Sequence, residues 1–121
     1  MERNEIIRVV REFSEYRDVR ISPELLLESV SYILELPREE ITGKSKKREL
    51  ITARQLIILY AAIYTNWTTT KIGKVVNRGY SDVSHLLRTA FEQTLNGTAP
   101  ELKSLFWKLK LRINDQKNWV K

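Results

Sequence analysis

The chain has 121 residues, a length typical of a single domain, and its lack of cysteine excludes disulfide bonds and thiolate metal sites. The formal net charge is +6, but residues 1–40 carry 6 basic and 10 acidic side chains, residues 41–97 carry 9 and 3, and residues 98–121 carry 6 and 2. The longest apolar run, residues 56–64, is far shorter than the roughly 20 residues of a membrane-spanning helix, and no secretory signal is visible, so we expect a cytoplasmic protein that does not enter a membrane.

Helical periodicity of the apolar residues, without sustained strand alternation, predicts an all-α domain of about six helices. The first helix is expected over residues 3–16. The second is expected to begin at Ser22-Pro23, because a serine side chain caps a helix and proline is tolerated in its first turn. Pro37 is expected to stop this second helix.

The middle of the chain predicts a loop followed by two helices. Residues 41–48 are rich in positive charge and are expected to form the loop. A long helix is expected over residues 49–64, and since its second half has no polar face, it should be the central buried helix. After a break, Thr68 or Thr69 is expected to cap a short helix that ends at Val76.

The remainder of the chain predicts two more helices. Residues 77–79 should form a tight turn, in which asparagine and glycine tolerate left-handed backbone, and Ser81 is expected to cap a helix that runs to residue 95. Asn96-Gly97 should end that helix, and Pro100 should open a final amphipathic helix.

Nothing in the sequence predicts an enzyme. The one histidine, His85, falls on the exposed side of its predicted helix, and no cysteine is available as a nucleophile. There is no glycine-rich phosphate loop, paired-carboxylate motif or metal-binding motif. We therefore predict a protein that is not catalytic and that uses no cofactor and no metal.

The short helix, the turn that ends at Gly79 and the helix from Ser81 have the spacing of a helix-turn-helix. A helix that enters the major groove of DNA must present small polar or basic side chains in its first turns. The polar side chains opposite the apolar stripe are Ser81, Ser84, His85 and Arg88, with Tyr80 directly before them. An ordinary corner of two helices with a polar outer face explains the spacing equally well.

The predicted loop before the central helix favours DNA. Lys44, Lys46, Lys47 and Arg48 place four cations in five residues, which can straddle a phosphate backbone or reach into a minor groove. A basic run alone is usually a solvated surface, but here it adds a second electropositive element to the segment that carries the helix-turn-helix. The excess of basic residues after residue 40 also indicates a polyanionic partner.

At these residues the chain resembles the C-terminal DNA-binding domain of the bacterial replication initiator DnaA, which has a Trp-repressor-like helix-turn-helix fold. Residues 41–48 match the family's basic loop, and Arg54-Gln55 match its Arg-Gln pair at the start of the central helix. Ile72-Gly73 match the Ile-Gly of its short helix. Residues 77–85 match its signature Gly-Arg-Asp-His-Thr-Thr-Val-Leu-His.

The resemblance implies roles for individual residues. Lys46 matches a loop arginine that enters the minor groove. Arg54 and Gln55 match residues that touch the DNA backbone and bases. Tyr80 and Ser81 match side chains that meet the major groove.

Among the departures from the family signature, two change the chemistry of the helix start. Gly79 stands in place of its Asp, and Asp82 stands in place of its second Thr. The Asp82 carboxylate favours the positive end of a helix but is repelled by phosphate, and it can accept a hydrogen bond from a cytosine amino group.

We therefore predict a stand-alone, sequence-specific reader of double-stranded DNA in replication or transcription control. It would be one domain, with a helix in residues 1–20, a DnaA-like core in residues 22–96 and a helix in residues 98–121. The residues expected to contact DNA are Lys44, Lys46, Lys47, Arg48, Arg54, Gln55, Thr69, Lys71, Arg78, Tyr80, Ser81, Asp82, Ser84, His85 and Arg88.

The alternative is a protein–protein interaction module that kept this fold and lost DNA binding. The terminal helices carry large apolar residues, such as Phe13, Phe106 and Trp107, which could bind a second copy in a homodimer or another protein. Packing of the same residues into the core of one domain explains their helical spacing as well.

Overall fold

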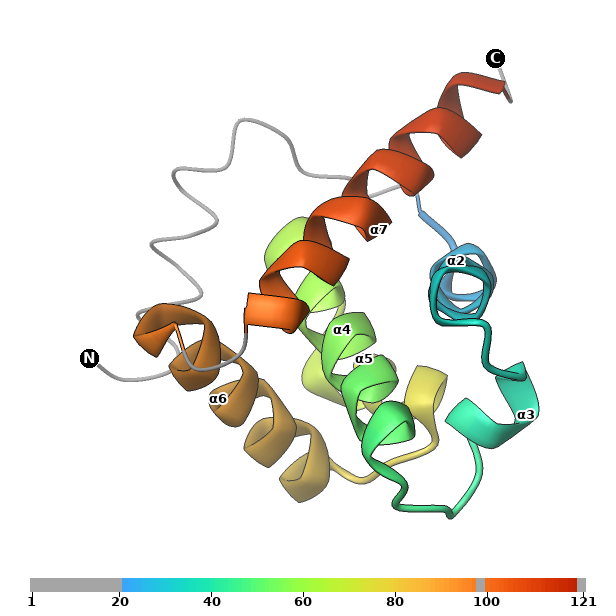
Figure 1. The fold of residues 1–121 in the computed structure, drawn as a ribbon. Coiled ribbons are helices and arrows are strands. Elements are labelled where there is room, and N and C mark those ends of the chain that lie inside the picture. Colours follow the sequence, from blue (N-terminus) through green and yellow to red (C-terminus); the bar gives the residue numbers. More distant parts are fainter. Residues whose placement is uncertain (1–20, 98–99, 120–121) are drawn as a thin grey trace.

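In the computed structural model, residues 21–97 and 100–119 are described, and they form six α-helices with no strand among them (Figure 1). The helices are α2 (Pro23–Leu34), α3 (Arg38–Ile41), α4 (Arg48–Tyr64), α5 (Thr69–Val76), α6 (Tyr80–Asn96) and α7 (Pro100–Trp119). The all-α prediction is confirmed. The helix predicted over residues 3–16 lies outside the described residues.

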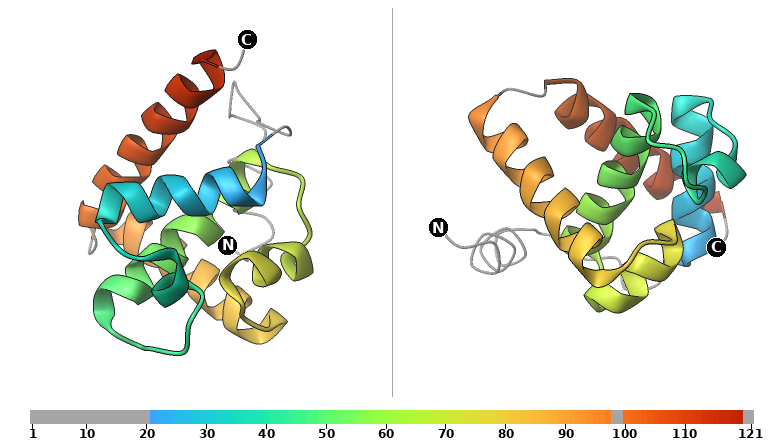
Figure 2. Two further views of the ribbon diagram at one scale, coloured as in Figure 1. Left: turned by 90° about the vertical axis from the view of Figure 1, so that its right-hand side faces the viewer. Right: turned by 90° about the horizontal axis from the view of Figure 1, so that it is seen from below.

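Helix α4 is the centre of the fold. It contacts α2, α3, α5, α6 and α7, and Figures 1 and 2 show the other helices arranged around it. Every residue from Ala53 to Tyr64 is buried, because this stretch has apolar side chains on all sides of the helix apart from Arg54 and Gln55. The prediction of a central buried helix is therefore confirmed, with its start at Arg48, one residue earlier than expected.

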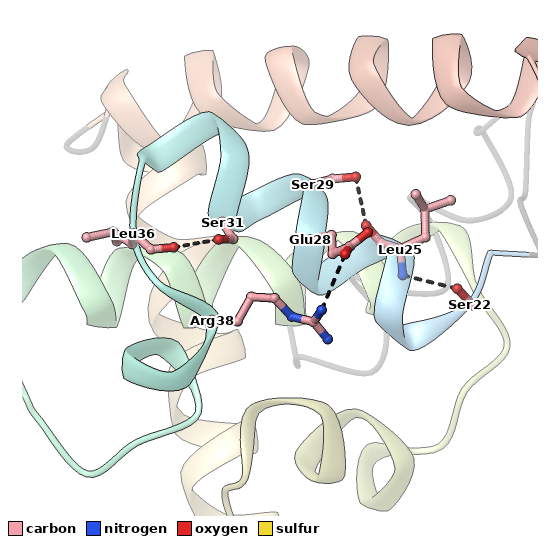
Figure 3. Close-up of polar contacts among 7 residues, drawn as sticks. All are labelled: Ser22, Leu25, Glu28, Ser29, Ser31, Leu36 and Arg38. Carbon is pink, nitrogen blue, oxygen red and sulfur yellow. Dashed lines mark hydrogen bonds and ion pairs between the residues drawn. The ribbon is translucent and has the colours of Figure 1, made fainter.

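Helix α2 begins as predicted and ends earlier than predicted. The hydroxyl oxygen of Ser22 accepts the backbone N–H of Leu25 at 3.0 Å, and Pro23 occupies the first turn (Figure 3). Pro37 does not stop this helix. It ends at Leu34 because Glu35 adopts a left-handed backbone with φ 56°, and its N–H bonds to carbonyls of the last turn.

The predicted loop over residues 41–48 is shorter than expected at both ends. Pro37 precedes the short helix α3, in which Ile41 is completely buried, so Ile41 belongs to a helix and to the core. Arg48 is the first residue of α4. The loop proper, residues 42–47, connects α3 to α4.

Helices α5 and α6 form the predicted helix-turn-helix. The Thr68 hydroxyl accepts the N–H of Lys71 at 3.1 Å, which confirms Thr68 as the cap of α5. Asn77 is left-handed, with φ 57°. The prediction that Ser81 caps α6 is wrong, because the carbonyl of Gly79 already accepts the N–H of Val83 at 3.1 Å, and the helix begins at Tyr80.

Helix α7 packs mainly into the core, which supports that reading of the C-terminal apolar residues. Leu102, Leu109 and Ile113 are buried, and the ring of Phe106 stacks on that of Tyr64 with centroids 5.8 Å apart. On its outer face, Trp107 is 52% exposed and Leu111 is 62% exposed. No helix in the described part of the chain combines the length and apolar character needed to cross a membrane.

Candidate nucleic-acid interface

The basic loop presents its charges to solvent. Lys44, Lys46, Lys47 and Arg48 are all exposed. None of them pairs with a carboxylate within the described residues, where the one ion pair joins Arg38 to Glu28 at 3.3 Å (Figure 3). Because no ion pair with a described carboxylate neutralises them, the four cations form a concentrated positive site.

The first turns of α6 lie at the same end of the molecule as this loop, the lower end in Figure 1 and in the left view of Figure 2. Buried Val83 and Leu87 hold the helix against the core, so the opposite face is turned outward. On that outward face Tyr80 is 60% exposed, Ser81, Asp82, His85 and Arg88 are exposed, and Ser84 is half-buried. The prediction that this polar face of the helix points toward solvent is thus confirmed.

Near the end of that face, His85 and Arg88 form a polar pair. The Arg88 guanidinium lies 3.4 Å from Nδ1 of His85, and the carbonyl of His85 accepts the hydroxyl of Thr89 at 2.9 Å. The His85 side chain is exposed. Within the described segments, no group of three or more histidine, cysteine or acidic side chains could hold a metal ion.

A groove of about 590 Å³ separates the basic loop and the N-terminal half of α4 from α6. Lys46 and Arg48 line it on one side and His85 on the other. Gln55 also lines it, and this side chain is 7% exposed with an amide that makes no hydrogen bond to another described residue. A nearly buried amide with free donors and an acceptor, between cationic side chains, suits a polar or anionic ligand group.

Arg54 and Arg78 are turned into the protein instead. Arg54 is 2% exposed; its Nε donates to the carbonyl of Ile41 at 2.8 Å, and its Nη2 donates to those of Glu40 and Gly43 at 3.2 and 3.1 Å. Burial, and then the nearby Arg78 guanidinium, lower the pKa of Arg54. Arg78 is half-buried and donates from Nη2 to the same Gly43 carbonyl, at 2.6 Å.

Two predicted residues of α5 lie apart from the groove. Thr69 is half-buried in the first turn of the helix, and Lys71 is exposed with its ammonium 5.0 Å from the centre of the Trp67 ring. Neither is among the side chains that line the groove. Lys71 nonetheless adds a positive charge to the start of the helix-turn-helix.

Sequence reasoning missed several residues of this surface. Thr52, Thr89 and Gln93 line the groove, and Gln93 could have been found from its spacing of eight residues, about two helical turns, after His85. Asn77 donates from Nδ2 to the carbonyl of Thr42 at 3.1 Å, a contact across 35 positions that no local pattern signals. Glu101 of α7 also lines the groove, the one acidic side chain among its lining residues.

Comparison with known proteins gives the family of this chain. The family described as the bacterial dnaA protein helix-turn-helix matches residues 23–89. The chromosomal replication initiator protein DnaA of Pseudothermotoga lettingae is 30% identical over 82 residues, which cover 68% of this chain and 18% of that protein. The protein of the same name from Bacteroides thetaiotaomicron is 32% identical over 89 residues, covering 69% and 19%.

The corresponding protein of Bacteroides fragilis is 30% identical over 83 residues, covering 68% of this chain and 17% of its own length. The chain thus spans less than a fifth of the length of these relatives. The match includes the loop, α4 and the helix-turn-helix through Thr89, which form the exposed cationic surface and most of the groove. The chain belongs to the family of the bacterial DnaA helix-turn-helix domain, a domain type that implies DNA binding.

Proposed function

We propose that this domain binds double-stranded DNA sequence-specifically, with the start of α6 in the major groove and residues 44–48 on the backbone or in the minor groove. The observation that carries the proposal is the position of four exposed cations at the same end of the molecule as the exposed first turns of α6. None of the four forms an ion pair with a residue that the structure describes. Its cellular role would be control of replication or transcription, in line with the replication initiators to which it is similar.

The shape of the surface suits a duplex. A major groove is about 12 Å wide and admits one α-helix, while the flanking phosphates need donors on either side of that helix. Lys46 and Arg48 would supply such donors from the loop side of the groove, and Gln55 would meet a phosphate or sugar oxygen inside it. His85 and Arg88 would follow the same strand along α6.

A titration against mixed-sequence duplex at several salt concentrations tests this proposal. Each phosphate neutralised by a lysine or arginine releases bound counterions, so the logarithm of the affinity should fall with the logarithm of the salt concentration at a slope of about −0.9 per contact. We expect a slope steeper than about −3, from the loop cations together with Arg88.

The absence of binding at about 50 mM salt and micromolar protein would overturn DNA binding, because electrostatic attraction is strongest there. That outcome would favour the alternative hypothesis, in which the domain kept this fold but binds another protein in place of DNA. The same titration with single-stranded DNA is the control for a purely electrostatic polyanion effect, for which the slope per contact is smaller, about −0.7.

Base reading is proposed for Tyr80, Ser81 and Asp82 in the first turn of α6. Asp82 has no ion-pair partner among the described residues, so its carboxylate is available to accept a hydrogen bond from a cytosine amino group. We expect Asp82→Asn to change the preferred base at one position by about 1–3 kcal/mol, because an amide both donates and accepts and so suits a different base edge.

Selection of preferred sites from random duplexes with each protein measures that change. Glu92→Gln is the matched control, since Glu92 is also exposed on α6 and the substitution removes the same charge further from the first turn. If Asp82→Asn and the unaltered protein prefer the same sites, Asp82 does not contact a base edge.

A further inference from the structure

Four consecutive backbone carbonyls, residues 40–43, each accept a hydrogen bond from a distant side chain; we refer to them as the carbonyl turn. Arg54 of α4 donates to the carbonyls of residues 40, 41 and 43. Asn77 donates to that of Thr42, and Arg78 to that of Gly43. The carbonyl turn directly precedes Lys44, so the start of the basic loop is bonded both to the central helix and to the turn of the helix-turn-helix.

Arg78 joins two turns of the chain. From Nη1 it donates to the carbonyls of Asn77 and Val76 at 2.9 and 3.4 Å, while from Nη2 it donates to Gly43. Both terminal nitrogens are therefore engaged within the protein. Hydrogen bonds from a charged donor are roughly twice as strong as neutral ones, so this bridge is a substantial link between the two turns.

The chemistry of the acceptors explains why arginine suits this place. Carbonyls at the C-terminal end of a helix have no partner within the helix and carry partial negative charge, and the carbonyl turn includes the end of α3. A guanidinium satisfies several such carbonyls at once because its donors point in fixed, divergent directions. Asn77 reaches Thr42 from its left-handed position, which also ends α5.

We propose that Arg78 and Arg54 are positioning residues, which fix the basic loop relative to the reading helix α6, and that neither donates its bonds to DNA. This inference rests on the proposed DNA-binding function, and it replaces the direct DNA contact that the family resemblance implies for Arg54 and the one expected from the sequence for Arg78. The loop and α6 then meet two parts of the duplex as one preformed unit, because the distance between them is set before DNA arrives.

The first experiment measures whether Arg78 acts through the loop. Affinity for mixed-sequence duplex and its salt slope are determined for Arg78→Ala, for Lys46→Ala/Lys47→Ala, and for the three substitutions combined. A positioning residue gives non-additive effects: Arg78→Ala should weaken binding about 3- to 10-fold when the loop cations are present, and by less than about 2-fold once they have been removed.

If Arg78 contacts a phosphate directly, Arg78→Ala would weaken binding by the same factor whether the loop lysines are present or replaced by alanine. It would also lower the salt slope by about 0.9 in both backgrounds, and this result would overturn the proposal. Arg88→Ala is the matched control, because Arg88 is exposed on α6 and its effect should be additive with the loop substitutions. If the unaltered protein binds no duplex, the proposed function fails, and the second experiment decides this inference by itself.

The second experiment follows the loop without DNA. We expect trypsin to cleave after the lysines and the arginine of residues 44–48 several-fold faster in Arg78→Ala than in the unaltered protein, at temperatures well below the melting transition of both. Asn77→Gly removes only the hydrogen bond to Thr42, since glycine keeps the left-handed backbone, and should raise the cleavage rate by a smaller factor. Arg78→Lys should restore part of the protection, and unchanged cleavage in Arg78→Ala would refute a positioning role.

Discussion

Replacing Lys46 and Lys47 with alanine is expected to weaken binding to mixed-sequence duplex by about 10- to 100-fold near 100 mM salt and to lower the salt slope by up to about two. Both side chains are exposed and lack an acidic partner among the described residues, so their full charge is available to DNA phosphates. Fluorescence anisotropy with a labelled duplex at four or five salt concentrations measures both quantities. The fold should be unaffected, because neither side chain packs in the core.

The matched control is Lys108→Ala/Lys110→Ala, which removes the same two charges from α7. That helix runs away from the loop end of the molecule in Figure 1 and in the left view of Figure 2. Lys110 lies 5.2 Å from the ring of Tyr64 and 4.9 Å from that of Trp107, so its loss can cost about 0.5–1 kcal/mol of stability, which a melting curve will record. Equal losses of DNA affinity in the two variants would mean that net charge, and not the loop, determines binding.

The fold could be predicted from the sequence where neighbouring residues alone determine the structure, as at a helix cap or in a wholly apolar helix. Ser22-Pro23 begins a helix because both residues satisfy the needs of a first turn, and residues 56–64 are buried because no side of that stretch is polar. Helix α3 could not be predicted in this way. It has four residues, of which three are charged, and it forms around the buried side chain of Ile41, whose place depends on contacts with α2 and α4.

The sequence was enough to predict which charged and polar side chains of the site are exposed. It was not enough to predict the hydrogen bonds that hold the site together from within. The cations of residues 44–48 and the polar face of α6 follow from composition and helical spacing. Arg54 and Arg78 look the same in a sequence as any exposed arginine, and only the path of the chain through residues 40–43 brings carbonyls to them. The approach of Glu101 to the groove likewise depends on how α7 packs, since Leu102 beside it is buried.

Within the helix-turn-helix, the sequence also did not identify which glycine the structure requires. Gly79 was expected to serve a tight turn, but Asn77 is the left-handed residue there, and nothing lies within 4 Å of where a Cβ of Gly79 would be. The glycine that the packing requires is Gly73, on the short helix. A Cβ at Gly73 would lie 2.5 Å from the carbonyl oxygen of Arg78 and 3.3 Å from a methyl group of Val83.

Gly73→Ala is therefore expected to destabilise the domain by about 1–3 kcal/mol, measured as a shift in the urea midpoint, even though alanine has the higher helix propensity. The clash is with backbone, which cannot rotate away, so α5 and the turn must separate. Because Arg78 is part of that turn and bonds to Gly43, the displacement should also loosen the basic loop and raise its tryptic cleavage.

Gly79→Ala is the matched control for this prediction. The substitution adds the same methyl group six residues later, at a position with open space and ordinary backbone, and should change stability by no more than about 0.5 kcal/mol. If Gly73→Ala is as stable as Gly79→Ala, the two helices can separate at no cost. The close contact between Gly73 and Arg78 would then not limit how α5 packs against the turn.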